Sequence, residues 1–76
     1  MNFGATLREQ RKMARYTLED VHQRTQLSIS FLSEMERDLV QPSLATLDTL
    51  RQCYGLSPRL FWLILAFSQP ENNNDN

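Results

Sequence analysis

Two hydroxyl side chains, Thr17 and Ser28, stand where short helices are expected to begin. A hydroxyl at this position accepts a hydrogen bond from one free backbone amide of the first helical turn. The other amides of that turn stay available and carry the positive end of the helix dipole. Helix starts of this kind suit a bound anion. We therefore predict that the region around these two residues binds negatively charged groups.

Catalytic chemistry is not indicated by the sequence. The single histidine and the single cysteine, His22 and Cys53, fall on different predicted helices. There is no glycine-rich loop, no metal-ligand spacing and no pair of carboxylates in an obvious cleft. We interpret His22 as a packing residue between two helices, and Cys53 as a half-buried core thiol rather than a reactive or metal-binding one. No enzymatic activity, metal, cofactor or small-molecule ligand is expected.

The two anion-binding helix starts belong to a pair of helices joined by a short turn at Gln26 and Leu27. Thr17 begins the first helix, and Asp20 follows three residues later in the position of a capping box. Ser28 begins the second helix. Each helix is shorter than the roughly 12 to 15 residues at which an isolated helix becomes marginally stable. The pair must therefore pack on the rest of the chain.

Three further helices are expected to supply that packing. Leu7 lies on the apolar stripe of the first, Ser43 begins the next, Gly55 ends it, and Pro58 begins the last. No run of residues alternates with period two, so no sheet is predicted. The sequence predicts an all-α protein. Its helices are expected at about residues 3–14, 18–25, 28–37, 44–53 and 58–67.

Residues 1–68 are expected to form one small domain, followed by a disordered polar tail at residues 69–76, QPENNNDN. A chain of 76 residues that is 41% hydrophobic can bury one core. The N-terminus has no apolar signal-peptide region, and the apolar run 60–67 is too short to cross a bilayer. One cysteine cannot form an internal disulfide. We expect a cytoplasmic protein without membrane association.

Several stretches together resemble the Cro/C1-type helix-turn-helix family, the lambda-repressor-like or Xre-like transcriptional regulators. These stretches are FGATLREQR, TLEDV, SISFLSEMER and QPSLATLDTLRQCYGLSPRLF, and the resemblance covers residues 3 to about 65. Its anchors are Leu7, Arg8, Arg11, Val21, Ser28, Leu32, Ser33, Met35, Glu36, Pro42, Ser43, Leu47 and Leu56. The resemblance implies a compact five-helix, lambda-repressor-like DNA-binding bundle. The helix-turn-helix would span about residues 17–37, and helix 28–37 would enter the major groove.

Three residues depart from the family pattern. His22 replaces a small alanine of the second helix, Gln26 replaces a glycine of the turn, and Asp38 replaces a glycine after the Glu-Arg pair. Gln26 would cost about 1 kcal/mol in the left-handed conformation, which aspartate adopts more readily. These changes affect the fine geometry of the helix pair and leave the fold unchanged.

The resemblance also implies which side chains of helix 28–37 contact bases. A serine can hydrogen-bond to either kind of base edge, an isoleucine can lie against a thymine methyl group, and a glutamate can accept from cytosine. Glu34 could instead repel phosphates at wrong sites, and the whole face could be an ordinary solvated surface. The predicted base contacts are Ile29, Ser30, Ser33, Glu34 and Arg37.

Phosphate contacts are expected from helix starts and from the loop before the fourth helix, the position from which family members hold the backbone. Capping alone is the alternative role for the hydroxyl residues, and the two roles are compatible. The predicted phosphate contacts are Thr17, Leu18, Ser28, Gln41, Ser43 and Arg11. In the family, the arginine and the glutamate that match Arg11 and Glu36 form an ion pair between the first and third helices. We expect the same pair here.

The last helix is apolar all round, which marks an interface at the edge of so small a domain. We expect Leu60, Leu63 and Ile64 to face the bundle. The outward, dimer-forming set would be Phe61, Trp62, Leu65 and Phe67. The predicted assembly is a symmetric homodimer that places two helices 28–37 about 34 Å apart on a palindromic operator. The alternative is that this surface binds a further domain or a partner protein.

The net charge of the chain is −1, which is unusual for a nucleic-acid binder. Its first 24 residues nevertheless carry five cations and three carboxylates. Nonspecific affinity should be weak, with a modest dependence on salt. The predicted function is a sequence-specific transcription regulator, a repressor or autoregulating controller, that binds double-stranded DNA. The alternative is a helix-turn-helix protein-interaction module such as an antitoxin or antirepressor.

Overall fold

Five α-helices make up the part of the chain that the computed structural model describes, residues 3–68. They are α1 (Gly4–Met13), α2 (Leu18–Thr25), α3 (Ile29–Glu36), α4 (Leu44–Tyr54) and α5 (Pro58–Ser68). No strand occurs within these residues. Each helix matches its predicted range to within one residue at either end, and the predicted all-α fold is confirmed. The predicted tail at residues 69–76 lies outside the described residues.

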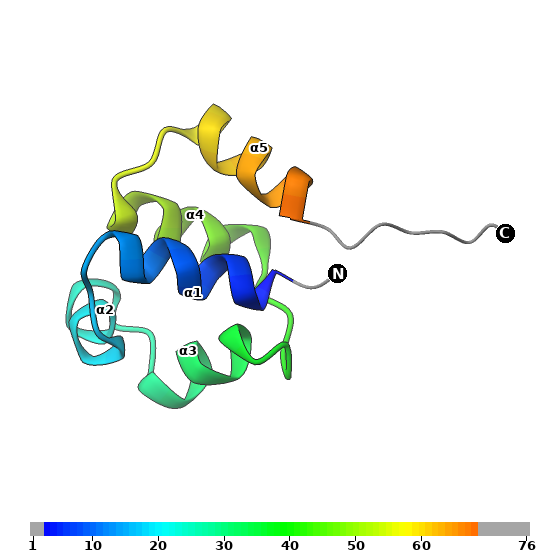
Figure 1. Ribbon diagram of the computed structural model, residues 1–76. Coiled ribbons are helices and arrows are strands. Elements are labelled where there is room, and N and C mark those ends of the chain that lie inside the picture. The colour runs from blue at the N-terminus through cyan, green and yellow to red at the C-terminus, as the bar shows by residue number, and fades with distance from the viewer. Residues whose placement is uncertain (1–2, 69–76) are drawn as a thin grey trace, which may run out of the picture.

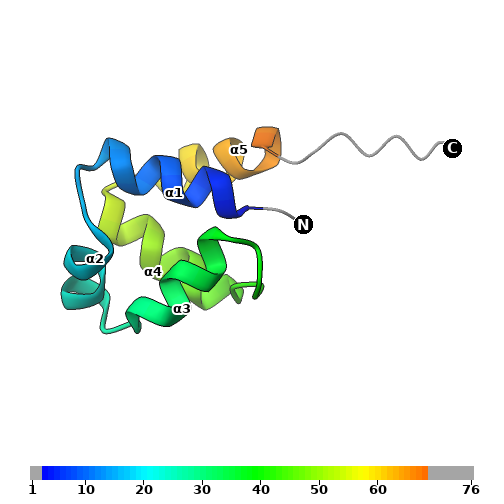
Figure 2. The same ribbon diagram turned by 60° about the horizontal axis from the view of Figure 1, so that its bottom comes forward.

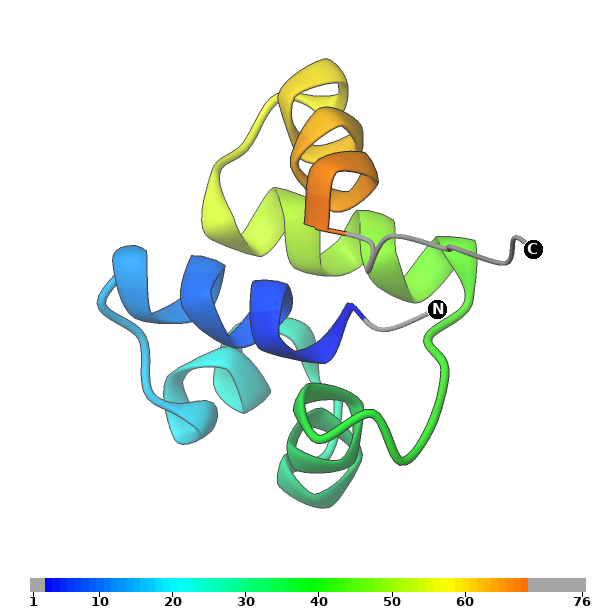
Figure 3. The same cartoon turned by 45° about the vertical axis from the view of Figure 1, so that its right-hand side comes forward.

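The helix pair α2 and α3 lies on one side of α1, and α5 lies on the other (Figure 1). α1 contacts both α3 and α5, whereas α2 contacts α3 and α4. Figure 2 shows the short connection between α2 and α3, and Figure 3 shows α1 and α4 between the α3 side and α5. The short helices α2 and α3 thus gain from α1 and α4 the packing that they cannot supply themselves. Across residues 3–68, no helix is long and apolar enough to span a membrane.

Local capping explains where the helices begin. Four of the five start at a hydroxyl side chain that accepts a backbone hydrogen bond, and three of these caps, Thr17, Ser28 and Ser43, were predicted from the sequence. The bonds run from Asp20 N to Thr17 Oγ1 (3.0 Å), Phe31 N to Ser28 Oγ (3.0 Å), Thr46 N to Ser43 Oγ (3.1 Å) and Leu60 N to Ser57 Oγ (3.2 Å). The exception is α1, whose N-cap residue Phe3 makes no such bond. The start of α1 must therefore be satisfied from elsewhere in the fold.

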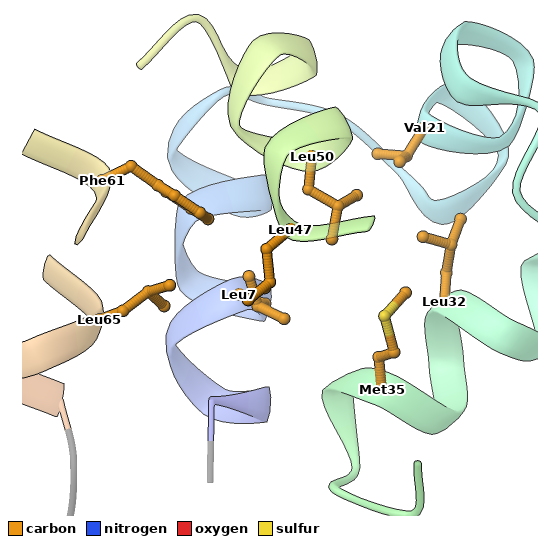
Figure 4. Packing of buried hydrophobic residues seen from close by; sticks show 8 residues of the cluster. All are labelled: Leu7, Val21, Leu32, Met35, Leu47, Leu50, Phe61 and Leu65. Atoms are coloured by element: carbon orange, nitrogen blue, oxygen red, sulfur yellow. The ribbon is translucent and has the colours of Figure 1, made fainter. Parts of the chain in front are cut away.

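All five helices contribute to one apolar core. Its fully buried members retain 2% exposure or less: Leu7, Val21, Leu32, Met35, Leu47, Leu50, Phe61 and Leu65. Figure 4 shows Phe61 and Leu65 of α5 pointing towards Leu7 and Leu47, with the side chains of α2 and α3 at the other end of the cluster. A contiguous set of apolar contacts therefore runs from α5 through the middle of the bundle to α3.

The predicted orientation of α5 was wrong at four positions, although Trp62 and Phe67 are exposed as expected. Phe61 and Leu65 were expected to face outward, but they are buried to 0% and 2% exposure. Leu60 and Leu63 were expected to face the bundle and instead remain 47% and 46% exposed. The reason is physical: a helix that is apolar all round has no polar face to define its rotation. Tertiary packing selects the rotation that places the large Phe61 ring in the core.

Three residues other than glycine adopt positive φ angles. Gln26 (φ 68°) ends α2 and Asp38 (φ 61°) follows α3, while Arg15 (φ 65°) lies between α1 and α2. At the first two positions the resemblance led us to expect glycine, the residue that adopts a left-handed turn most readily. Gly55 ends α4 at φ 74°, as predicted. Arg15, Gln26 and Asp38 thus adopt the left-handed conformation, which costs free energy because each has a side chain.

Candidate nucleic-acid interface

The face of α3 that points away from the core is polar. Leu32 and Met35 are buried on the opposite face, at 2% and 1% exposure. Ser30 and Arg37 are exposed, Ser33 and Glu34 are half-buried beside them, and Ile29 retains 40% exposure at the edge. The structure therefore brings the five predicted base-contacting residues onto one side of one helix. Such a surface offers hydroxyl, carboxylate, guanidinium and methyl groups for base edges.

The start of α2 has less capacity for an anion than the sequence suggested. Its capping box is complete, because Thr17 N also donates to Asp20 Oδ2 over 2.8 Å. These hydrogen bonds with Thr17 lower the pKa of Asp20, so its carboxylate stays charged to a lower pH than that of an ordinary aspartate. Leu18 is half-buried behind the exposed Thr17. A negative charge in the first turn offsets part of the positive potential that would attract a phosphate.

The starts of α3 and α4 are better suited to phosphate. Neither helix has an acidic residue in its first turn. Their caps, Ser28 and Ser43, are both exposed, and so is Gln41 in the connecting loop. Each serine hydroxyl occupies only one amide of its helix, which leaves other first-turn amides directed outward. Ser28, Gln41 and Ser43 therefore remain suitable for contacts with a phosphate backbone.

Arg11 connects α1 to α3 through the expected ion pair. Its Nε and Nη2 atoms donate to the two Glu36 carboxylate oxygens over 2.7 and 3.0 Å. Nη1 donates to the backbone oxygen of Tyr16 over 2.9 Å. Hydrogen bonding to Glu36 raises the pKa of Arg11, and burial raises the pKa of the nearby Tyr54 phenol well above its usual range. Because the Arg11 side chain is only 10% exposed, its main role is to hold α3 in place.

A second connection between α1 and α3 was not predicted. Asp38 Oδ1 accepts a hydrogen bond from Gly4 N over 2.9 Å and so caps α1, which has no cap of its own. A Cβ atom on Gly4 would lie 2.5 Å from the backbone oxygen of Glu36. Only glycine permits this approach of the two helix ends. Only two features of the sequence pointed indirectly to this contact. The first helix has no capping residue of its own, and Asp38 stands after α3 where the family pattern has glycine.

Arg8 is a site residue that the sequence analysis missed. It lines a depression together with Leu18, Ser33 and Arg37, where α1, α2 and α3 meet. Arg11 and Glu36 form the floor of that depression as an ion pair. Arg8 and Arg37 are exposed, and neither is in an ion pair within residues 3–68. The sequence could have indicated Arg8 as a contact residue, since it lies three residues before Arg11 on the same helix face.

The histidine and the cysteine have structural surroundings. His22 Nδ1 lies 2.8 Å from the backbone oxygen of Leu27, which can only accept, so Nδ1 donates and links α2 to the turn. Cys53 is half-buried on α4, and burial raises the pKa of its thiol. In the part of the chain that the structure describes, no group of three or more histidine, cysteine or acidic side chains could hold a metal ion.

Two comparisons with known proteins both point to a helix-turn-helix domain. Residues 2–61 match the model of a family described as helix-turn-helix domain. The chain is also 39% identical over 57 residues to the HTH-type transcriptional regulator DdrOP3 of Deinococcus deserti. That alignment covers 75% of this chain and 44% of DdrOP3, so the chain spans less than half of the relative. No solved structure matches the chain.

Proposed function

The chain belongs to the helix-turn-helix domain family, and on that premise we propose that it is a sequence-specific transcription regulator of double-stranded DNA. The observation that carries the proposal is the polar outer face of α3, which the Arg11–Glu36 pair fixes to α1. α3 enters the major groove, where its first turns reach base edges. This assignment to a DNA-binding family also agrees with the expectation that the protein is not an enzyme.

The proposed base contacts are the α3 residues Ser30, Ser33 and Glu34, with Ile29 at the edge and Arg37 at the end. Ser30 and Arg37 are exposed, and Ser33 and Glu34 are half-buried beside them. Glu34 makes no side-chain hydrogen bond or ion pair within residues 3–68, so its carboxylate is available to accept from a cytosine amino group. Specificity in this proposal comes from short polar side chains, because arginine occurs only at the end of the helix.

Phosphate contacts are proposed for the helix starts and the cations around this face. Ser28 caps the start of α3, Gln41 and Ser43 follow its end, and Thr17 caps α2. Leu18, Arg8 and Arg37 line the depression where α1, α2 and α3 meet. Arg11 contributes through its remaining exposed edge. Arg24 is not among the proposed contacts, because its guanidinium is stacked on the Tyr16 ring, with Cζ 4.4 Å from the ring centroid. The salt dependence of binding should accordingly be modest.

We further propose that the protein belongs to the Cro/C1-type subgroup and acts in the cytoplasm as a repressor or autoregulating controller. As a homodimer it would bind a palindromic operator, with two copies of α3 about 34 Å apart. The homodimer compensates for a low positive charge by doubling the number of base contacts. The anchors of the resemblance and the exposed apolar residues of α5 support this assignment.

The alternative of a protein-interaction module loses part of its support. It relied on Glu34, Glu36 and Asp38 as an acidic surface for a protein. Glu36 is bound to Arg11, and Asp38 is bound to Gly4. Glu34 is then the one carboxylate of the three that remains for a partner within residues 3–68. The geometry therefore favours the DNA-binding proposal.

Selection of bound sequences from random duplex DNA tests the proposal. We expect enrichment of an inverted repeat by the wild-type chain and loss of that enrichment in Ser30→Ala/Glu34→Ala. A matched control is Thr49→Ala/Gln52→Ala, which alters two exposed polar residues of α4 outside the proposed contact surface. Absence of any enriched sequence, with the wild-type protein folded, would reject DNA reading by α3 and restore the interaction-module alternative.

A further inference from the structure

We propose that an apolar cavity between the start of α1, the start of α4 and the end of α5 binds a small, uncharged aromatic molecule, and that this ligand lowers DNA affinity through Gln41. The effect on DNA rests on the proposed function, whereas ligand binding itself does not. The cavity has a volume of about 510 Å³, and roughly 300–1,000 Å³ is usual for small-molecule sites. Figure 3 shows the start of α1, the start of α4 and the end of α5 at the same end of the molecule. Such a ligand was not expected from the sequence, because the lining residues come from three separate segments.

The floor and one wall of the cavity are fixed by the core. Leu47 and Leu65 form the floor, and both are buried at 2% exposure. Trp62 forms a wall and is 39% exposed. Its ring packs edge-on against the buried Phe61 ring, with 5.6 Å between the two ring centroids. The cavity is therefore formed before a ligand arrives, which reduces the ordering cost of binding.

The residues around the cavity indicate the chemistry of the ligand. None of the described residues that line it carries a charge, so a charged ligand would lose hydration without gaining an opposite charge. Phe3 and Trp62 offer aromatic rings, against which another ring packs in offset or edge-on contact. Gln41 adds a side-chain amide, which can donate to or accept from a ligand hydroxyl. These groups suit an uncharged aromatic molecule with one hydroxyl or N–H group.

Other occupants from this chain fit the cavity less well. The last eight residues, QPENNNDN, have no apolar side chain except that of proline. The exposed apolar residues of α5 that support the homodimer, Leu60, Leu63 and Phe67, border a different depression between α1 and α5. The cavity is lined instead by Trp62 and Ala66, on another side of α5. The size and composition of the cavity therefore favour a small molecule.

Gln41 connects the cavity to the proposed DNA surface. It lines the cavity and is also a proposed phosphate contact, two residues before the α4 cap Ser43. A ligand that hydrogen-bonds to the Gln41 amide withdraws this amide from the phosphate backbone. The loss of one net hydrogen bond lowers affinity by about three- to tenfold. By linkage, DNA lowers the affinity for the ligand by the same factor.

The first experiment measures ligand binding to the whole chain without DNA. Trp62 is the one tryptophan of the sequence, so its indole N–H gives a single signal in ¹H–¹⁵N NMR spectra. We expect cinnamyl alcohol, an uncharged aromatic alcohol, to shift this signal saturably with a dissociation constant below about 1 mM. Cinnamate has the same skeleton with a carboxylate and should bind at least about tenfold more weakly. No saturable shift, or equal binding of the two compounds, would overturn the proposed site.

Two alanine variants test whether the ligand occupies the cavity. Ala66→Phe fills the cavity from an exposed position and should weaken binding of cinnamyl alcohol at least about tenfold. Ala45→Phe is the matched control, because Ala45 is exposed on α4 and does not line the cavity. Circular dichroism verifies that both variants retain their helices. Unchanged binding by Ala66→Phe, or an equal loss in Ala45→Phe, would place the ligand elsewhere and overturn the site.

The second experiment measures affinity for a duplex selected from random DNA, with and without saturating cinnamyl alcohol, by fluorescence anisotropy. The wild-type chain should lose about three- to tenfold in DNA affinity when the ligand is present. Gln41→Ala should bind the duplex more weakly without the ligand and should not respond to it. An unchanged wild-type affinity, or an equal response in Gln41→Ala, would overturn the coupling through Gln41.

These outcomes are distinct from failure of the proposed function. A chain that binds cinnamyl alcohol but enriches no DNA sequence would reject the regulator and keep the cavity. A chain that enriches a DNA sequence but binds no cinnamyl alcohol would keep the regulator and reject the cavity. A fall in molar mass on addition of the alcohol, measured by analytical ultracentrifugation, would assign the cavity to a contact between copies and overturn the small-molecule site.

Discussion

α3 and α5 lie on opposite sides of α1, yet they are held in different ways. α3 buries Leu32 and Met35 and is also fixed to α1 by directional contacts at Glu36 and Asp38. α5 is anchored chiefly by the burial of Phe61 and Leu65 in the core. Apolar burial stabilises without specifying direction, whereas charged hydrogen bonds fix distance and orientation. The helix proposed to read DNA is thus oriented by polar contacts, and the helix proposed to bind a second copy is oriented by packing.

The largest expected effect concerns the packing of α5. Phe61→Ala should reduce the free energy of unfolding by about 3–5 kcal/mol, because it opens a cavity at a fully buried ring. Met13→Ala is the matched control: Met13 is 71% exposed on α1, outside the apolar face of α5, so its truncation should change stability by less than about 0.5 kcal/mol. Urea unfolding of both variants measures the difference. Equal stabilities for the two variants would show that α5 is not anchored by Phe61.

Arg11→Ala tests the polar attachment of α3. Removing the arginine leaves the Glu36 carboxylate, only 8% exposed, without its partner. Breaking a buried pair costs about 3–5 kcal/mol, and the lower end applies because both side chains retain some exposure. DNA affinity should fall more than the loss of folded protein explains, since α3 loses its orientation.

Arg8→Ala is the control for this loss. Arg8 is exposed and free of ion pairs within residues 3–68, so its removal should weaken DNA binding with a change in unfolding free energy below about 0.5 kcal/mol. An Arg11→Ala variant as stable as Arg8→Ala would remove the distinction between the two attachments.

Gly4→Ala sharpens the comparison at the junction of α1 and α3. Glycine to alanine within a helix normally stabilises by up to about 1 kcal/mol. Here the opposite sign is expected, because the new methyl group would lie 2.5 Å from the Glu36 backbone oxygen. A loss of about 1–3 kcal/mol is typical of such overpacking. Thermal unfolding measures the change in stability of Gly4→Ala and shows its sign. Ala5→Gly, at the exposed neighbouring position, is measured alongside it. A stabilised Gly4→Ala protein would contradict the close contact.

Local interactions explain which features could be predicted from the sequence. Caps such as Thr17 and Ser43 bond to amides three residues away, so both partners lie within one short window. The orientation of α3 was also predictable, because Leu32 and Met35 lie three residues apart on one face and the opposite face is mostly polar. The Arg11–Glu36 pair spans 25 residues and was expected only through a family resemblance.

The missed features depend on contacts between distant segments. Gly4 and Asp38 are 34 residues apart, and no local pattern links an aspartate after α3 to the start of α1. The sequence pattern could not determine the rotation of α5, because all its faces are apolar. Tertiary packing buries Phe61 and leaves Leu60 exposed. Arg8 joins the α3 surface only when α1 packs beside it. Each of these features requires the tertiary arrangement as well as the helix boundaries.

The smallest effect is expected at the turn before α3. Gln26 has φ 68°, and its backbone N–H donates to His22 O over 2.7 Å. Glycine adopts this conformation without the steric cost of a side chain, so Gln26→Gly should stabilise the fold by at most about 1 kcal/mol. The Gln26 side chain donates a 3.2 Å bond to Gln23 O, whose loss subtracts a few tenths of that gain.

Arg15→Gly is the matched control for Gln26→Gly, because Arg15 has a similar φ of 65° but connects α1 to α2 instead of α2 to α3. Both substitutions should raise the melting temperature by similar amounts. Only Gln26→Gly should leave DNA affinity unchanged, since Arg15→Gly also removes one of the five cations of the first 24 residues, which hold three carboxylates. If Gln26→Gly weakened DNA binding while stabilising the fold, the turn would help to set the angle of α3. The orientation of that helix would then depend on local backbone strain as well as on Arg11 and Asp38.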